Sequence, residues 1–254
     1  MPQPSEPARL RVFAEASLAG LAVLAYLWLW RLYGFDLVDE GTQLLQIARA
    51  AGGALPYTDF ETGYTPGYFA LEGWLLQFGA FAAIRTFGVL LQAGVAAALY
   101  ALLRVNAGLY TALGAVAMLV AFALPVSLGT GAPSNIPYPG WLALPAVLAA
   151  AALLARLGER RSPRRERVDL LLVGVASGIA FAFKPNTGIF MLGGAVLAVA
   201  ATWQPMALAQ RLLGWSLRIA AVAALLWLLM PTLGTRLGIA LLAPTLLAVL
   251  VAGP

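Results

Sequence analysis

Long apolar stretches separated by short polar segments make up most of the chain. A helix of about 20 apolar residues crosses a bilayer core of about 30 Å. No charge occurs from Val105 to Ala155, and Gly and Pro signals within 129–140 divide that run into two helices. The pattern predicts an all-α, polytopic membrane protein with about eight spans. They are expected near 12–33, 86–103, 107–125, 140–156, 170–183, 187–203, 219–233 and 237–252.

The segment 34–84, between the first two spans, has a different pattern. Apolar positions recur at helical spacing from Asp39 until Gly52-Gly53 ends the helix. An extended aromatic stretch, 55–60, follows, and Pro66 then opens a second short, apolar helix that runs to about Gly79. We expect both helices to lie at the membrane surface.

Composition agrees with a membrane protein, since 61% of the 254 residues are hydrophobic and 11% are charged. We expect a single transmembrane domain over 1–254. The chain has no Cys and no His, which excludes disulfides, thiol nucleophiles, Ser-His catalysis and zinc sites built on nitrogen or sulfur. The net charge of +5 predicts no nucleic-acid partner, because six of the 16 cations lie between Arg156 and Arg167, as in a topology signal.

The distribution of Lys and Arg predicts the orientation. Cations concentrate in the N-terminal segment, at Arg104 and in the 156–168 loop, so these parts are expected in the cytoplasm and 34–84 outside. The first span is expected to be a retained signal-anchor. A single Lys beside many Arg, Ala and Gly residues is typical of a GC-rich bacterium, which predicts a bacterial cytoplasmic membrane protein with its N-terminus inside.

Acidic residues are concentrated on the opposite side. Six of the 11 acids lie in 34–84: Asp36, Asp39, Glu40, Asp59, Glu61 and Glu72. The outer loop 34–84 is therefore the part of the chain where we expect chemistry.

The order of features in this loop resembles the GT-C superfamily of polytopic glycosyltransferases, which use polyprenyl-phosphate-linked sugars. The features are Asp39-Glu40 after the first span, an interfacial helix, the Tyr57-x-Asp59-Phe stretch, a Pro-led helix, and Arg85 opening the next span. The Gly174–Pro185 stretch also resembles the small-residue helix of these enzymes, which ends in a Lys-Pro turn. Protein O-mannosyltransferases and aminoarabinose transferases are the nearest types.

Two departures accompany the resemblance. The His-Pro-Pro-Leu signature of the mannosyltransferases is absent, and Thr65-Pro66-Gly67 stands in its place. Family members continue with further spans and an outer C-terminal domain, so we expect this chain to be a fragment or a short relative that lacks a C-terminal part.

The resemblance implies transfer of a sugar from a polyprenyl-phosphate donor to an unidentified acceptor at the outer face of the lipid membrane. It implies that Asp39 is the base, and Glu40 is the second catalytic candidate; both residues also suit the first turn of a helix. Arg85 and Lys184 are candidates for binding the donor phosphate, or they are lipid-headgroup anchors.

Tyr57 and Asp59 complete the candidate substrate-binding set. No metal ligand is assigned, although Asp59 and Glu61 could join Asp39 and Glu40 around Mg²⁺ or Mn²⁺, because these ions prefer oxygen ligands. Glu72 lies in an apolar helix and is expected to form an ion pair, with Arg85 as its partner.

The alternative is a multi-pass transporter or flippase subunit. Transporters place ionisable residues near the bilayer midplane and carry internal repeats. The second to fourth spans have no charge at mid-depth and no repeat is evident, so the pattern favours an enzyme at the outer interface.

Overall fold

The computed structural model describes residues 6–32, 39–122, 138–156 and 163–202, together with Ser216 and Ala223. All regular structure in these ranges is helical, which confirms the all-α prediction. The helices are α1 (Glu6–Trp30), α2 (Asp39–Ala51), α3 (Pro66–Asn106), α4 (Leu109–Phe122), α5 (Pro139–Leu154), α6 (Pro163–Phe183) and α7 (Pro185–Thr202).

The count of eight spans is not confirmed. Two helices in the described ranges are long and apolar enough to cross a membrane, Pro7–Trp30 and Pro66–Asn106. Shorter apolar helices cover Leu109–Ala121, Pro139–Leu154 and Pro185–Val199. The predicted spans 219–233 and 237–252, and residues 157–162 of the Arg-rich loop, lie outside the described residues.

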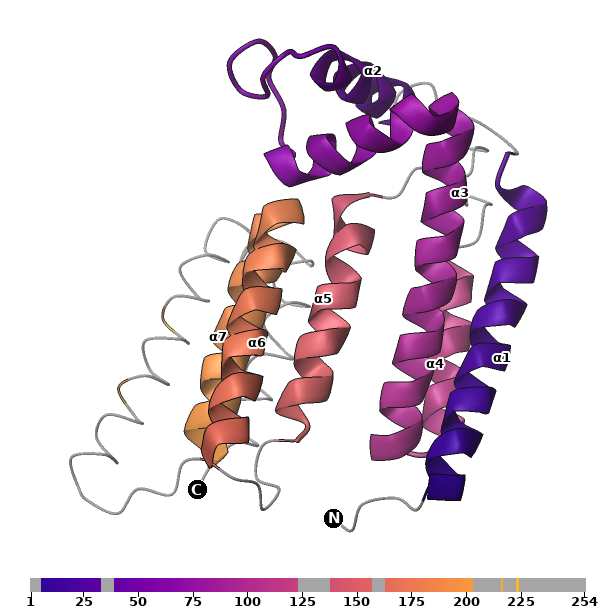
Figure 1. The fold of residues 1–254 in the computed structure, drawn as a ribbon, viewed down its shortest axis with the longest axis vertical. Coiled ribbons are helices and arrows are strands. Elements are labelled where there is room, and N and C mark those ends of the chain that lie inside the picture. Colours follow the sequence, from indigo (N-terminus) through magenta and orange to yellow (C-terminus); the bar gives the residue numbers. More distant parts are fainter. Residues whose placement is uncertain are drawn as a thin grey trace.

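A sharp bend divides α3 into two parts. Gly79 and Ala80 leave the helical conformation, and Ala80 has φ 52° and ψ −144°, a conformation that a residue with a Cβ rarely adopts. The first part, 66–78, lies across the ends of the other helices, whereas 81–106 runs beside α1 (Figure 1). The second short helix predicted in this segment is therefore present and is joined to the following helix through the bend; its position at a membrane surface stays a prediction.

The long helices form two packed groups. The first group is α1, the 81–106 part of α3 and α4, and the second is α5, α6 and α7 (Figure 1). The helices α1 and α3 approach closely at Gly20, where an added Cβ would lie 3.0 Å from the Cβ of Ala97. Val23, Leu27, Val89 and Ala96 are buried beside this contact and form its apolar core.

The two ends of the helices differ in charge. Arg9, Arg11, Arg104, Arg156 and the arginines of the first turn of α6 belong to helix ends at the bottom of Figure 1. The helix α2 and the segment 66–78 lie at the opposite end, and Lys184 lies there too, between α6 and α7. Within the described residues, the cations of the N-terminal segment, Arg104 and the start of α6 are therefore at the opposite end of the molecule from the acids of 39–78.

Candidate functional site

The outer loop folds into a compact unit that we call the cap, residues 39–78. Its core contains Ile47, Phe60, Tyr68, Phe69 and Leu75, and the Phe60 and Phe69 rings meet edge to face with centroids 5.5 Å apart. The 66–78 part of α3 packs directly on α2 at position 73, where an added Cβ would lie 3.5 Å from the Cβ of Ala51, an ordinary van der Waals distance. The cap is therefore a folded element and not an irregular loop.

Asp39 and Glu40 are the first two residues of α2. The side chain of Asp39 lies outside the described part of the structure. Glu40 is buried completely, with 0% of its side chain exposed, although it belongs to a surface segment. The two candidate catalytic residues are thus adjacent in the chain, and the environment of Glu40 is defined.

Glu40 forms a buried ion pair with Arg85. The Nη2 of Arg85 donates to Oε2 of Glu40 at 3.0 Å, and 2% of the Arg85 side chain is exposed. The guanidinium also stacks on Phe81, with 4.1 Å from Cζ to the ring centroid, and Nη1 donates to the carbonyl oxygen of Arg31 at 3.5 Å. The pair joins the beginning of α2 to the helix that follows the bend.

This geometry corrects two expectations. Arg85 was expected at the depth of lipid headgroups, available to a phosphate, but its side chain is enclosed by Glu40 and Phe81. Arg85 was also the expected partner of Glu72, and that prediction is wrong, because its guanidinium bonds Glu40 whereas neither carboxyl oxygen of Glu72 has a hydrogen-bond partner. The physical reason is their spacing on α3: the 13 residues between them correspond to about 20 Å of helix, and the bend at Gly79-Ala80 does not bring the two segments together.

Tyr57 and Asp59 hold the loop between α2 and α3. The Oδ2 of Asp59 accepts from the backbone N–H of Leu55 at 2.7 Å, and the backbone oxygen of Asp59 accepts from Nη2 of Arg49 at 2.6 Å. The hydroxyl of Tyr57 donates to the backbone oxygen of Tyr64 at 2.6 Å. Both side chains are exposed, and the contacts that they make lie within the cap. These hydrogen bonds shape the loop, and substrate binding by the two residues stays a prediction.

Lys184 is exposed and occupies the single position between α6 and α7. Its Nζ lies over the first turn of α5, 3.4 Å from where a Cβ on Gly140 would be. No carboxylate lies within 4.0 Å of this ammonium in the described ranges. The positive ends of the α5 and α7 dipoles are close to the same ammonium group, so the local field attracts an anion.

The N-terminus of α3 is fastened beside this site. The hydroxyl of Thr65 donates to the backbone oxygen of Phe183 at 2.8 Å. Position 67 requires glycine, since an added Cβ would lie 2.5 Å from the carbonyl oxygen of Ala182. The cap thus meets the end of α6 directly before Lys184.

Glu72 is the most unusual residue of the cap. Its side chain is 0% exposed, and burial raises the pKa of its carboxyl to about 8. Tyr68 lies one turn earlier on the same helix and donates to Oε1 of Gln43 at 2.9 Å. Burial raises the pKa of the Tyr68 phenol, and Glu72, Tyr64 and Tyr138 act in the same direction, so these groups are close to it. A buried acid and three phenols therefore lie where the cap meets the start of α5.

No group of three or more acids in the described ranges is arranged to hold a metal ion. Asp59 and Glu61 are exposed, and Glu40 is engaged with Arg85, so the oxygen ligands considered from the sequence are not gathered around one point in the described part.

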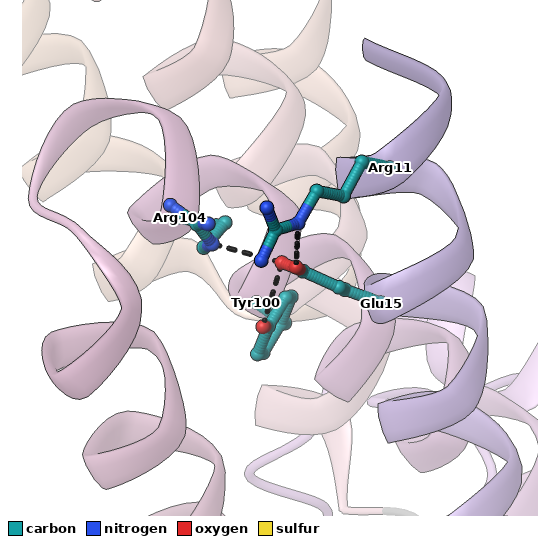
Figure 2. A network of polar contacts seen from close by, with 4 residues as sticks. All are labelled: Arg11, Glu15, Tyr100 and Arg104. Atoms are coloured by element: carbon teal, nitrogen blue, oxygen red, sulfur yellow. Dashed lines mark hydrogen bonds and ion pairs between the residues drawn. The ribbon is translucent and has the colours of Figure 1, made fainter. Parts of the chain in front are cut away.

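The opposite end of the molecule carries a separate polar network, which Figure 2 shows. The carboxylate of Glu15 accepts hydrogen bonds from Arg11 at 2.8 Å, from Arg104 at 2.8 Å and from the Tyr100 hydroxyl at 3.1 Å. Because Arg104 and Tyr100 belong to α3, the network fastens α1 to α3. The first helix thus packs on α3 through polar contacts as well as through its apolar face.

Sequence reasoning did not single out Tyr68 or Tyr138 as site residues, and it did not predict the close contact of Lys184 with α5. The aromatic and glycine residues of the 64–68 and 138–140 segments are visible in the sequence. The proximity of these two segments depends on tertiary structure and has no local signal. Comparisons of the chain with protein-family models, with curated proteins and with solved structures found no match.

Proposed function

We propose that the protein is a multi-pass membrane glycosyltransferase that moves a sugar from a polyprenyl-phosphate donor to an acceptor at the outer membrane face. The observation that carries the proposal is the arrangement of the cap. It places Asp39-Glu40 at the start of a helix at one end of the bundle, opposite the arginine-rich end, and the Glu40–Arg85 pair fixes that start.

Embedding in a bilayer is supported by the helices themselves. Large apolar side chains on α1 are exposed along its length, including Phe13, Leu18, Leu21 and Leu29, and α6 exposes Leu171 and Val175. Such surfaces are stable against lipid and not against water. The arginine-rich end would face the cytoplasm and the cap would face outward.

Asp39 is the proposed general base. Transfer of a sugar to a hydroxyl requires a group that accepts the hydroxyl proton, and a chain without His or Cys offers carboxylates for this task. Glu40 is enclosed and paired, so we assign it a positioning role: it fixes the first turn of α2, and with it the backbone of Asp39.

Lys184 is the proposed contact for the donor phosphate. Its exposed ammonium lies over the N-terminal turn of α5 and directly before α7, where both helix dipoles favour an anion. A phosphate at this place would leave the attached sugar beneath the cap.

The test is transfer by the purified chain in proteoliposomes. The donors are polyprenyl phosphates carrying labelled mannose, glucose or arabinose, and the acceptor is an envelope fraction from cells that lack the gene. We expect label to leave one donor and enter acceptor material. Movement of an intact donor between leaflets without loss of its sugar would contradict transfer and support the transporter or flippase alternative.

A further inference from the structure

Glu72 has an environment that folding alone does not favour. Its carboxyl is completely buried, and neither oxygen has a hydrogen-bond partner. Burying a polar group without hydrogen bonds costs free energy, and an apolar residue of similar size would avoid that cost. Residues that are unfavourable for stability are frequent at functional sites.

The surroundings of Glu72 suit a polyhydroxylated ligand. A carboxyl that is neutral near physiological pH both donates and accepts hydrogen bonds, as sugar hydroxyls do. The phenols of Tyr68 and Tyr138 supply further hydroxyls and aromatic faces in the same junction between the cap and α5. Tyr68 is held in place by its hydrogen bond to Gln43.

The junction also lies beside the proposed phosphate contact. Tyr138 is the residue before α5, and Gly140, two residues later, is close to the Nζ of Lys184. A donor whose phosphate contacts Lys184 therefore has its sugar next to the residues around Glu72.

Entry of a ligand requires the cap to move, because Glu72 is enclosed. The bend at Gly79-Ala80 is the natural hinge, since Ala80 is held in a conformation that residues with a Cβ avoid. A shift of 66–78 about this point would open the junction between the cap and α5, and it would break the Thr65–Phe183 hydrogen bond and the Gly67–Ala182 contact at the start of α3.

We propose that Glu72, together with Tyr68 and Tyr138, binds the sugar of the lipid-linked donor between the cap and α5. This inference rests on the proposed function and adds to it the residues that recognise the sugar.

Two variants separate this role from a role in folding. Glu72→Leu removes the carboxyl, and Glu72→Gln keeps its shape and hydrogen-bonding groups. Gln92→Leu is the matched control: Oε1 of Gln92 is also buried without a hydrogen-bond partner, but it lies in the 81–106 part of α3, away from the cap. We expect Glu72→Leu and Gln92→Leu to unfold at the parent's temperature or above it.

The decisive readout is equilibrium binding of two probes to the chain in nanodiscs. One probe is polyprenyl phosphate without a sugar, and the other is the same lipid carrying the sugar that the parent binds best. We expect Glu72→Leu to lower the affinity for the sugar-bearing probe by about tenfold or more and to leave the affinity for the sugar-free probe unchanged. Glu72→Gln should lose less affinity for the sugar-bearing probe than Glu72→Leu does. Gln92→Leu should bind both probes like the parent.

The outcomes distinguish the two proposals. Equal binding of the sugar-bearing probe by the parent and by Glu72→Leu would overturn the role of Glu72 and leave the proposed function intact. A clearly lower unfolding temperature in Glu72→Leu, with equal losses for both probes, would make Glu72 a folding residue and overturn the inference. Failure of the parent to bind either probe would overturn the proposed function and this inference with it.

Discussion

Arg85 and Glu40 are 45 residues apart in the chain, yet Nη2 of Arg85 lies 3.0 Å from Oε2 of Glu40, and both side chains are buried. In a buried ion pair, the attraction between the two charges is opposed by the cost of removing both from water, so the net contribution of the pair to stability is small. Removing one member is different, because the remaining charge stays buried and unpaired. The pair therefore acts mainly to specify how the cap docks on α3.

Replacing one member of this pair should destabilise the fold much more than replacing both members. We expect Arg85→Met and Glu40→Leu each to destabilise the fold by about 3–5 kcal/mol, and the double variant to recover most of that loss. Thermal unfolding of the four proteins in one detergent tests this. Additive losses in the double variant would show that the pair does not couple the cap to α3.

Lys184 should contribute to donor binding and little to stability. Its ammonium is exposed and has no carboxylate within 4.0 Å in the described ranges, so we expect Lys184→Ala to unfold at the parent's temperature. Loss of a charge-assisted bond to phosphate should weaken binding of polyprenyl phosphate by about 1.5–3 kcal/mol, or about ten- to hundredfold.

Two controls accompany this measurement. Lys184→Arg retains the charge and should retain most of the affinity, whereas Arg164→Ala removes an exposed cation from the opposite end and should change nothing. Parental affinity in Lys184→Ala would remove this residue from the phosphate site.

Glu72 should make the stability of the protein depend on pH. Its pKa is about 8 in the folded protein against a usual value of 4.5. Below about pH 4.5 the carboxyl is protonated whether the chain is folded or unfolded, so it adds no pH dependence. Between about pH 4.5 and about pH 8, the Glu72 carboxyl of the unfolded chain has released its proton, whereas that of the folded chain keeps it. The free energy of unfolding therefore falls as pH rises, by up to about 1.4 kcal/mol per pH unit, and levels off above about pH 8.

Because the chain has no His, few other groups titrate in this window. Unfolding temperatures of the parent should decline from about pH 5 to about pH 9, and Glu72→Gln should show a much flatter profile. Identical profiles for the two proteins would mean that Glu72 is solvated in the folded state.

The orientation can be tested by labelling, since the chain has no native Cys. Thr58 is exposed in the cap and Arg164 is exposed at the opposite end, so single Cys residues at these positions report the two sides. An impermeant thiol reagent should label Thr58→Cys in intact cells and Arg164→Cys only after permeabilisation. The reverse pattern would place the cap in the cytoplasm.

Much of the local structure follows from sequence rules. The helix expected from Asp39 to Gly52-Gly53 is α2, and Pro66 opens α3 as expected of proline in a first turn. The Lys184-Pro185 break separates α6 from α7, since proline cannot continue the hydrogen bonds of a preceding helix. These features depend on neighbouring residues, which a sequence displays directly.

The pairing of charges could not be predicted in the same way. Glu72 is nearer to Arg85 in sequence than Glu40 is, which made it the expected partner. Thirteen residues of continuous helix would separate them by about 20 Å, and the bend does not bring their segments together. Glu40 reaches Arg85 because the cap folds back on α3, a tertiary contact without a local signal.

Asp39 is the proposed base of sugar transfer at the outer face, and Asp39→Asn removes that base with little change in shape. Asn preserves the size of the side chain and its suitability for a helix start, so the variant should fold like the parent. The assay is transfer of labelled sugar from the donor that the parent uses, with helicity and unfolding temperature measured in parallel. Asp59→Asn, a change of the same chemistry at an exposed acid of the cap, is the control. We expect turnover about 10²–10⁴-fold below the parent in Asp39→Asn and a much smaller loss in Asp59→Asn. Near-parental turnover in Asp39→Asn would show that Asp39 is not the base.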